Sequence, residues 1–143
     1  MKSPFWQGAL GLQRALNIPR FGFLWTNLLC CDQGKTTPMT EFHDVIREHS
    51  PFRAELKTLK PDVVIFFTGR WYDYTIKRYF PGCKFEQVGQ SSRLLDRIIF
   101  PDAPMLMLRS YHPKYLLLGR FWDTIKTIAE FVKAEQRLEV VKA

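Results

Sequence analysis

Short apolar runs alternate along the chain with segments in which apolar residues recur every three or four positions. The runs predict strands at 23–29, 63–67 and 105–108. The run Val63-Val64-Ile65-Phe66-Phe67 has no polar alternation, which is typical of a strand covered on both faces. The helical spacing predicts helices over the ranges 5–16, 40–50, 52–59, 72–80 and 120–137.

Residues 83–103 lack a clear period. Gly89, Ser91, Ser92 and Pro101 interrupt their scattered apolar positions, so we expect irregular structure with a short helix near Leu94. Strands that alternate with helices indicate an α/β fold, and specifically a three-layer α/β/α arrangement with a mostly parallel central sheet. A length of 143 residues fits a single domain over 1–143.

A small or polar residue follows each predicted strand. Asn27 closes the first run, Gly69 follows the second, and Tyr111-His112-Pro113 follows the third. Open α/β sheets bind their ligands at the carboxyl ends of the strands. The sequence therefore predicts a site formed by these three segments.

The charge of the chain favours a polyanionic partner without identifying one. There are 21 Lys and Arg residues against 14 Asp and Glu, which gives a net charge of +7. The basic residues are scattered and form no continuous block. Nucleic acid is thus one partner class among several at this point.

The three cysteines make a poor disulfide framework. Cys30 and Cys31 are adjacent, Cys83 is alone, and the count is odd, so we expect a reducing, cytoplasmic location. No run approaches the roughly 18 apolar residues that a membrane span requires, so no membrane association is expected. The oligomeric state does not follow from the sequence.

Three segments together resemble the uracil-DNA glycosylase superfamily, most closely its iron-sulfur branch. They are Thr26-Asn27-Leu28-Leu29-Cys30-Cys31, the stretch Leu59-Lys60-Pro61-Asp62-Val63-Val64-Ile65 that ends at Gly69, and Tyr111-His112-Pro113-Lys114-Tyr115-Leu116-Leu117. The resemblance spans roughly residues 20–135 and implies a uracil-DNA glycosylase-like fold. It also implies DNA binding and hydrolysis of the N-glycosidic bond of a flipped uracil.

The resemblance gives Asn27 and His112 the main roles in catalysis and substrate binding. A carboxamide matches the N3–H donor and O4 acceptor of uracil and mismatches cytosine. Bond cleavage leaves negative charge on the departing pyrimidine, and a donor fixed at O2 stabilises the transition state. Without the resemblance, Asn27 would be interpreted as a capping residue and His112 as structural.

Further residues are expected around this pair. Gly69 and Tyr111 would contact the substrate, because glycine lets the backbone approach a ligand. Lys114 stands where the family has Ser, and an ammonium can also hold a phosphate. Leu116 matches the apolar wedge that replaces a flipped nucleotide. Further DNA contacts are expected from the basic residues Lys35, Arg70, Lys77, Arg93 and Arg97.

Two features of the family are missing. Its first motif, a Gly-rich turn after an N-terminal strand that bears the water-positioning group, has no match, so the chain is either a shortened version or closes its sheet differently. The four cysteines of an iron-sulfur cluster are also incomplete: Cys31 matches one, but the position near His49 or Ser50 is not Cys. Cys30, Cys31, His43 and His49 lack zinc spacing, so no metal and no cofactor are expected.

Two functions remain open from the sequence. The first is a glycosylase-like enzyme of DNA base-excision repair. The alternative is a catalytically inactive homologue that binds nucleic acid or protein through the same loops. A generic small-molecule enzyme is disfavoured, since there is neither a nucleotide-binding glycine fingerprint nor a nucleophilic serine elbow.

Overall fold

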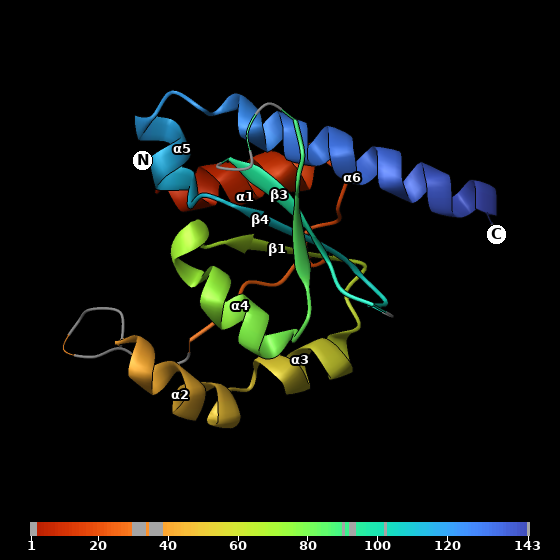
Figure 1. Cartoon of the computed structure of the whole chain (residues 1–143). Helices are drawn as coiled ribbons and strands as arrows, with labels where there is room; N and C mark the ends of the chain where they lie inside the picture. Colours follow the sequence, from red (N-terminus) through yellow and green to blue (C-terminus); the bar gives the residue numbers. More distant parts are fainter. Residues whose placement is uncertain are drawn as a thin grey trace.

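A computed structural model describes residues 3–29, 34, 39–89, 91, 94–101 and 103–142. The described part has a mixed α/β fold around a four-stranded sheet with the order β1-β4-β3-β2. The strands are β1 (Val63–Phe67), β2 (Lys84–Gln87), β3 (Leu95–Ile99) and β4 (Leu106–Ser110). The sheet is open, with β1 at one edge and β2 at the other (Figure 1).

The expectation of a mostly parallel sheet is wrong. Only β1 and β4 are parallel, with Val63 opposite Leu106 and Phe67 opposite Ser110. The other two pairings, β2 with β3 and β3 with β4, are antiparallel. The difference comes from residues 83–103, which form the antiparallel β2 and β3 rather than the expected irregular stretch with a helix near Leu94. Gly89 and Ser91, two of the residues that suggested irregularity, lie in the connection between these strands.

The second correction concerns residues 23–29, which form no strand. Phe21, Leu24 and Trp25 are exposed, by 89%, 71% and 56%. An apolar run becomes a strand only when a neighbouring strand takes its backbone hydrogen bonds. In the described part of the chain β1 pairs with β4 alone, so residues 23–29 have no partner in the sheet.

Helices cover one face of the sheet with aliphatic side chains. They are α1 (Pro4–Ala15), α5 (Pro113–Leu118) and α6 (Asp123–Lys142), and they lie together above the sheet in Figure 1. Leu12, Leu116 and Ile128 from these helices pack with Leu95 and Leu108 from the sheet. The predicted helices at 5–16 and 120–137 are confirmed, and α6 continues past its expected end.

The opposite face is covered by α3 (Phe52–Leu59) and α4 (Asp73–Tyr79), and its core is largely aromatic. Phe52, Phe66, Tyr79 and Phe80 meet there, with ring centroids 5.1 to 6.3 Å apart in edge-on contacts. The helix α2 (His43–His49) follows a short 3₁₀ turn, η1 (Thr40–Phe42), and a second turn, η2 (Arg70–Tyr72), leads from β1 into α4.

The strand β1 is covered on both faces, as its unbroken apolar run predicts. Val63, Ile65 and Phe67 pack against the aliphatic core, while Val64 and Phe66 pack against the aromatic core. Only Phe66 is fully buried, because the outer edge of β1 is open. Among the described helices, none combines the length and apolar character needed to cross a lipid bilayer.

Candidate functional site

The loops after β1 and β4 lie side by side, as expected for neighbouring parallel strands. The backbone N–H of Gly69 donates to the carbonyl oxygen of Ser110 over 2.9 Å. Gly69 has a φ of +62°, and a Cβ atom there would lie 3.1 Å from two ring carbons of Tyr111. A glycine is therefore required both by the left-handed backbone and by the ring that lies against it.

His112 begins helix α5 and caps it. The Lys114 backbone N–H donates to His112 Nδ1 over 3.2 Å, and Pro113 occupies the first helical position. Because Nδ1 accepts a hydrogen bond, the proton of the neutral ring lies on Nε2. Burial lowers the pKa of His112 below its ordinary value of 6.5, and the positive charge of Lys114 lowers it further. At neutral pH, His112 thus presents a neutral N–H donor.

One aromatic side chain stacks on His112 and contacts two further aromatic side chains. The ring of Phe5 stacks on the imidazole, with a centroid distance of 5.7 Å and an angle of 25° between the planes. Phe5 also contacts Trp6 at 5.3 Å and Trp25 at 5.6 Å. We call Phe5, Trp6, Trp25 and His112 the surface aromatic cluster, because Trp6 and Trp25 are 42% and 56% exposed.

The position of this cluster depends on the close approach of α1 to α5. A Cβ atom at Gly8 would lie 2.9 Å from Cγ of Pro113, so only glycine lets the two helices meet at this distance. Phe5 lies three residues before Gly8 and therefore on the same helix face. Pro113 follows His112 directly, so the contact at Gly8 brings Phe5 against the imidazole.

Asn27 lies in an exposed, irregular segment that is held on either side. Two residues before it, Trp25 contacts Phe5 of the surface aromatic cluster. One residue after it, the carbonyl oxygen of Leu28 accepts a hydrogen bond from the Tyr79 hydroxyl over 3.2 Å. Among the residues that the structure describes, no hydrogen bond or ring contact joins Asn27 to His112. They are linked through Trp25, which contacts Phe5, and Phe5, which stacks on His112.

A buried ionic network lies beneath the two loops. The guanidinium of Arg109, on β4, pairs with the Asp96 carboxylate and with Asp73, whose Oδ1 is 3.0 Å from Nε. Arg109 also lies over the ring of Phe85, 5.5 Å from its centroid. Burial raises the pKa of both carboxyls, and the charge of Arg109 opposes that rise. The network ties the start of α4 to β3 and β4.

The expected DNA contacts divide into exposed and buried residues. Lys114 and Arg70 are exposed next to His112 and Gly69, where a phosphate can reach them. Leu116 is fully buried in the aliphatic core, so the expectation that it wedges into DNA is wrong. The helix α5 turns Leu116 inward and exposes Leu117 and Leu118 instead, by 43% and 70%. Lys35, Arg93, Cys30 and Cys31 lie outside the described residues.

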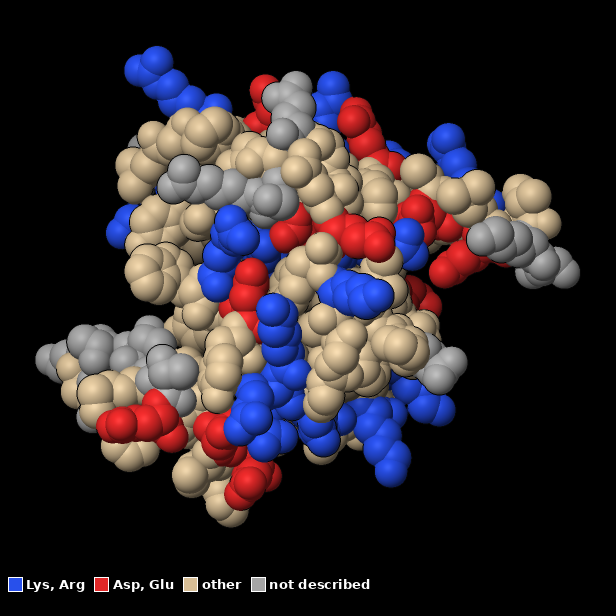
Figure 2. Space-filling view, viewed as in Figure 1, with Lys and Arg blue, Asp and Glu red and all other residues tan. Residues whose placement is uncertain are grey.

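Basic side chains also gather away from the surface aromatic cluster. Figure 2 shows Lys and Arg concentrated over α3, α4 and the neighbouring sheet. The exposed basic residues of these elements are Arg53, Lys57, Lys77, Arg78 and Lys84. Arg78 is neutralised in part by an ion pair with Asp44, and Arg97 pairs with Glu135 over 2.9 Å.

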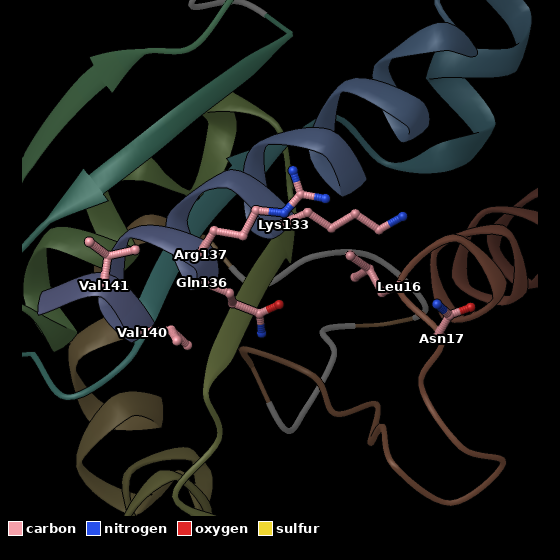
Figure 3. Close-up of a pocket in the computed structure, with 7 residues that line it drawn as sticks. All are labelled: Leu16, Asn17, Lys133, Gln136, Arg137, Val140 and Val141. Atoms are coloured by element: carbon pink, nitrogen blue, oxygen red, sulfur yellow. The ribbon is translucent and has the colours of Figure 1, made fainter. Parts of the chain in front are cut away.

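Two grooves lie away from the surface aromatic cluster. One runs between the end of α1 and the last turns of α6, where Lys133, Gln136, Arg137, Val140 and Val141 face Leu16 and Asn17 (Figure 3). A second groove lies between α6 and the amino ends of β1 and β4, with Asp62, Val63 and Leu106 in its wall. Neither groove includes His112 or the two exposed indoles.

The aromatic partners of His112 are functional candidates that the sequence analysis missed. Phe5 and Trp6 lie in a helix assigned to packing, and Trp25 lies in a predicted strand. A signal was present in the spacing of Phe5, Gly8 and Gly11 at three-residue steps, which predicts a helix face that packs closely. The local sequence does not indicate which element that helix face packs against.

No family model, curated protein or solved structure matches this chain. In the described part of the chain, no three His, Cys, Asp or Glu side chains are arranged to hold a metal ion. The site is therefore assessed from its own geometry and charge.

Proposed function

We propose that the protein is a uracil-DNA glycosylase-like enzyme that binds DNA and hydrolyses the N-glycosidic bond of a flipped uracil. The observation that carries the proposal is the state of His112, which follows a sheet strand and is neutral with its proton on Nε2. The mixed α/β fold supports the proposal only in part: helices cover both faces of the sheet, but only β1 and β4 have the parallel pairing that we expected.

Cleavage of the glycosidic bond requires a hydrogen-bond donor at a fixed position, and not a group that transfers a proton. As the bond to the sugar breaks, negative charge collects on O2 and O4 of the departing pyrimidine. His112 Nε2–H would donate to O2, while the Asn27 carboxamide would pair with N3–H and O4. The stacking of Phe5 and the hydrogen bond to Nδ1 hold the imidazole in place, so the donor needs no reorganisation in the transition state.

The surrounding residues complete a binding surface for a nucleotide. The Tyr111 ring, which lies against the buried Gly69, would form its floor. Lys114 and Arg70 are exposed beside it and would hold the phosphates on either side of the flipped base. Substrate binding thus uses the carboxyl ends of β1 and β4.

A second candidate is a non-catalytic nucleic-acid-binding protein of the same architecture. One observation favours it: residues 3–29 and 111–122, which supply the surface aromatic cluster, contain no Asp or Glu. A carboxylate that could position the attacking water is therefore missing from both segments. This version would bind the base without breaking the bond.

Release of free uracil from a uracil-containing oligonucleotide distinguishes the two functions. We expect release by the wild-type protein and a loss of roughly 100-fold or more in His112→Ala. His49→Ala is the matched control, because His49 is exposed at the end of α2 and should leave the rate unchanged. Binding of the oligonucleotide without any base release would select the non-catalytic function.

A further inference from the structure

We propose that the surface aromatic cluster binds single-stranded nucleic acid, with unpaired bases stacked on Trp6 and Trp25. The inference deepens the proposed function by naming the form of the substrate, and it rests on that function only for the identity of the reacting base. The juxtaposition that carries it is two exposed indoles that both contact Phe5, whose ring stacks on the imidazole of His112.

The exposure of these rings is the first argument. Trp6 is 42% and Trp25 is 56% exposed, although apolar cores are available on both faces of the sheet. Their ring centroids are 6.4 Å apart and their planes are inclined by 57°. Two rings at that inclination offer separate faces, so each can take a different base of a bent, flexible strand.

The support behind the rings is the second argument. Phe5 contacts Trp6, Trp25 and His112, and the close contact between Gly8 and Pro113 fixes the helix that bears it. The indoles are thus backed by an aromatic side chain on a packed helix. A stacking surface that is ordered before binding loses less conformational entropy when a ligand arrives.

Charge is the third argument, and it indicates the class of partner. Residues 3–29 contain Arg14 and Arg20, residues 111–122 contain Lys114 and Arg120, and neither segment contains an acidic residue. Of these, Lys114 is exposed two residues after His112, and its backbone N–H donates to the imidazole. Aromatic faces beside a cation are typical of non-specific single-strand binding. A duplex keeps its bases stacked inside, so it can offer the indoles only its backbone and its ends.

The experiment measures binding of a fluorescein-labelled oligothymidylate of about 16 nucleotides by anisotropy, with the corresponding duplex alongside. The oligonucleotide lacks uracil, so the result does not depend on glycosylase activity. We expect tighter binding of the single strand than of the duplex, with quenching of tryptophan fluorescence. Trp6→Leu and Trp25→Leu should each weaken single-strand binding about tenfold.

The controls separate stacking from folding and from charge. Phe42→Leu is matched in exposure to Trp6, at 43% against 42%, and lies outside the cluster, so it should bind like the wild type. The thermal midpoint of each variant should stay near that of the wild type. The salt dependence of binding should also keep its slope, because no cation is removed.

Several outcomes would overturn the inference. They are no binding of the single strand, equal affinity for duplex and single strand, or unchanged affinity in the double variant Trp6→Leu and Trp25→Leu. Recovery of a bound protein that competes for the two indoles while oligothymidylate does not bind would identify a protein-docking surface instead. If oligothymidylate binds as expected but uracil is never released, the proposed enzymatic function fails and this inference stands.

Discussion

Aromatic side chains gather at two places in this molecule, and the two places differ in what surrounds them. Phe52, Phe66, Tyr79 and Phe80 meet between the sheet and helices α3 and α4, and each is at most 8% exposed. The surface aromatic cluster has similar ring contacts, yet its indoles are about half exposed. Ring contacts alone therefore do not separate a core from a binding surface.

What separates the two sets is the cost of removing a ring. A buried ring contributes through the apolar area that it removes from water and the cavity that its loss would leave. An exposed ring contributes less of either, and exposed rings that form one contiguous cluster are typical of a binding surface. Substitutions of a buried ring and of an exposed ring test this difference.

The largest effect is expected from Phe66→Ala. Phe66 is 5% exposed on β1 and contacts Phe52 and Phe80 edge-on, so truncation should lower the free energy of unfolding by about 3–5 kcal/mol. Urea denaturation followed by circular dichroism gives the value. Trp25→Ala, at 56% exposure, should cost at most about 1 kcal/mol. Equal losses at the two positions would contradict the distinction between core and surface.

Replacing Arg109 tests whether the sheet face under α4 can hold two carboxylates without the guanidinium that pairs with them. Arg109 is 0% exposed, and its replacement by Met leaves the carboxylates of Asp73 and Asp96 without their cation. We expect Arg109→Met to lose about 3–5 kcal/mol of unfolding free energy at pH 7. The measurement is urea denaturation at several pH values.

The pH dependence has a definite sign. Burial raises the pKa of Asp73 and Asp96 above 3.8, so the folded state holds protons that the unfolded state has already released. Stability therefore falls as pH rises from about 3.8 through the raised values. Arg109 opposes the shift, so Arg109→Met should extend the fall to higher pH and regain stability on acidification. The variant that also carries Asp73→Asn and Asp96→Asn should lose this dependence; if it persists, other groups cause it.

The elements that could be predicted from the sequence are those with a local cause. The spacing in α1, α3 and α4 and the unbroken apolar run of β1 each decide one element. The strand predicted at 23–29 is absent because a strand also needs a neighbouring strand to pair with, and the local sequence pattern does not show whether one is available. The pair β2 and β3 does not follow from the local pattern, because Gly89 and Ser91 predict irregular structure, whereas in the fold they only connect two short strands.

The same division holds for the candidate site. That His112 follows a strand and precedes a turn of helix is visible in Tyr111-His112-Pro113, and the structure places it after β4. Its contact with Phe5 joins residues more than 100 positions apart and depends on how α1 docks at Pro113. Burial of Leu116 depends on the rotation of α5, which its three leucines in a row leave open.

The smallest expected effect is a change in the pKa of His112, the half-buried member of the surface aromatic cluster. Burial is the main cause that lowers the pKa of His112, and the charge of Lys114 is the second. In Lys114→Gln the pKa should rise but stay below 6.5, because the burial remains. An NMR titration of the imidazole measures the pKa directly, and the ¹⁵N shifts of the neutral ring should report the proton on Nε2.

Lys126→Gln is the matched control, because Lys126 is 78% exposed on α6 and pairs with Glu130. It should leave the pKa of His112 unchanged.

A lowered pKa also means that the folded state resists protonation, so His112 contributes stability above pH 6.5 that is lost as pH falls toward the folded value. Below that value Nδ1 carries a proton and cannot accept from the Lys114 N–H, so the cap of α5 opens. A pKa at or above 6.5 in the wild type would show that the imidazole is hydrated, and the exposed indoles would then lie beside a cation rather than a neutral donor.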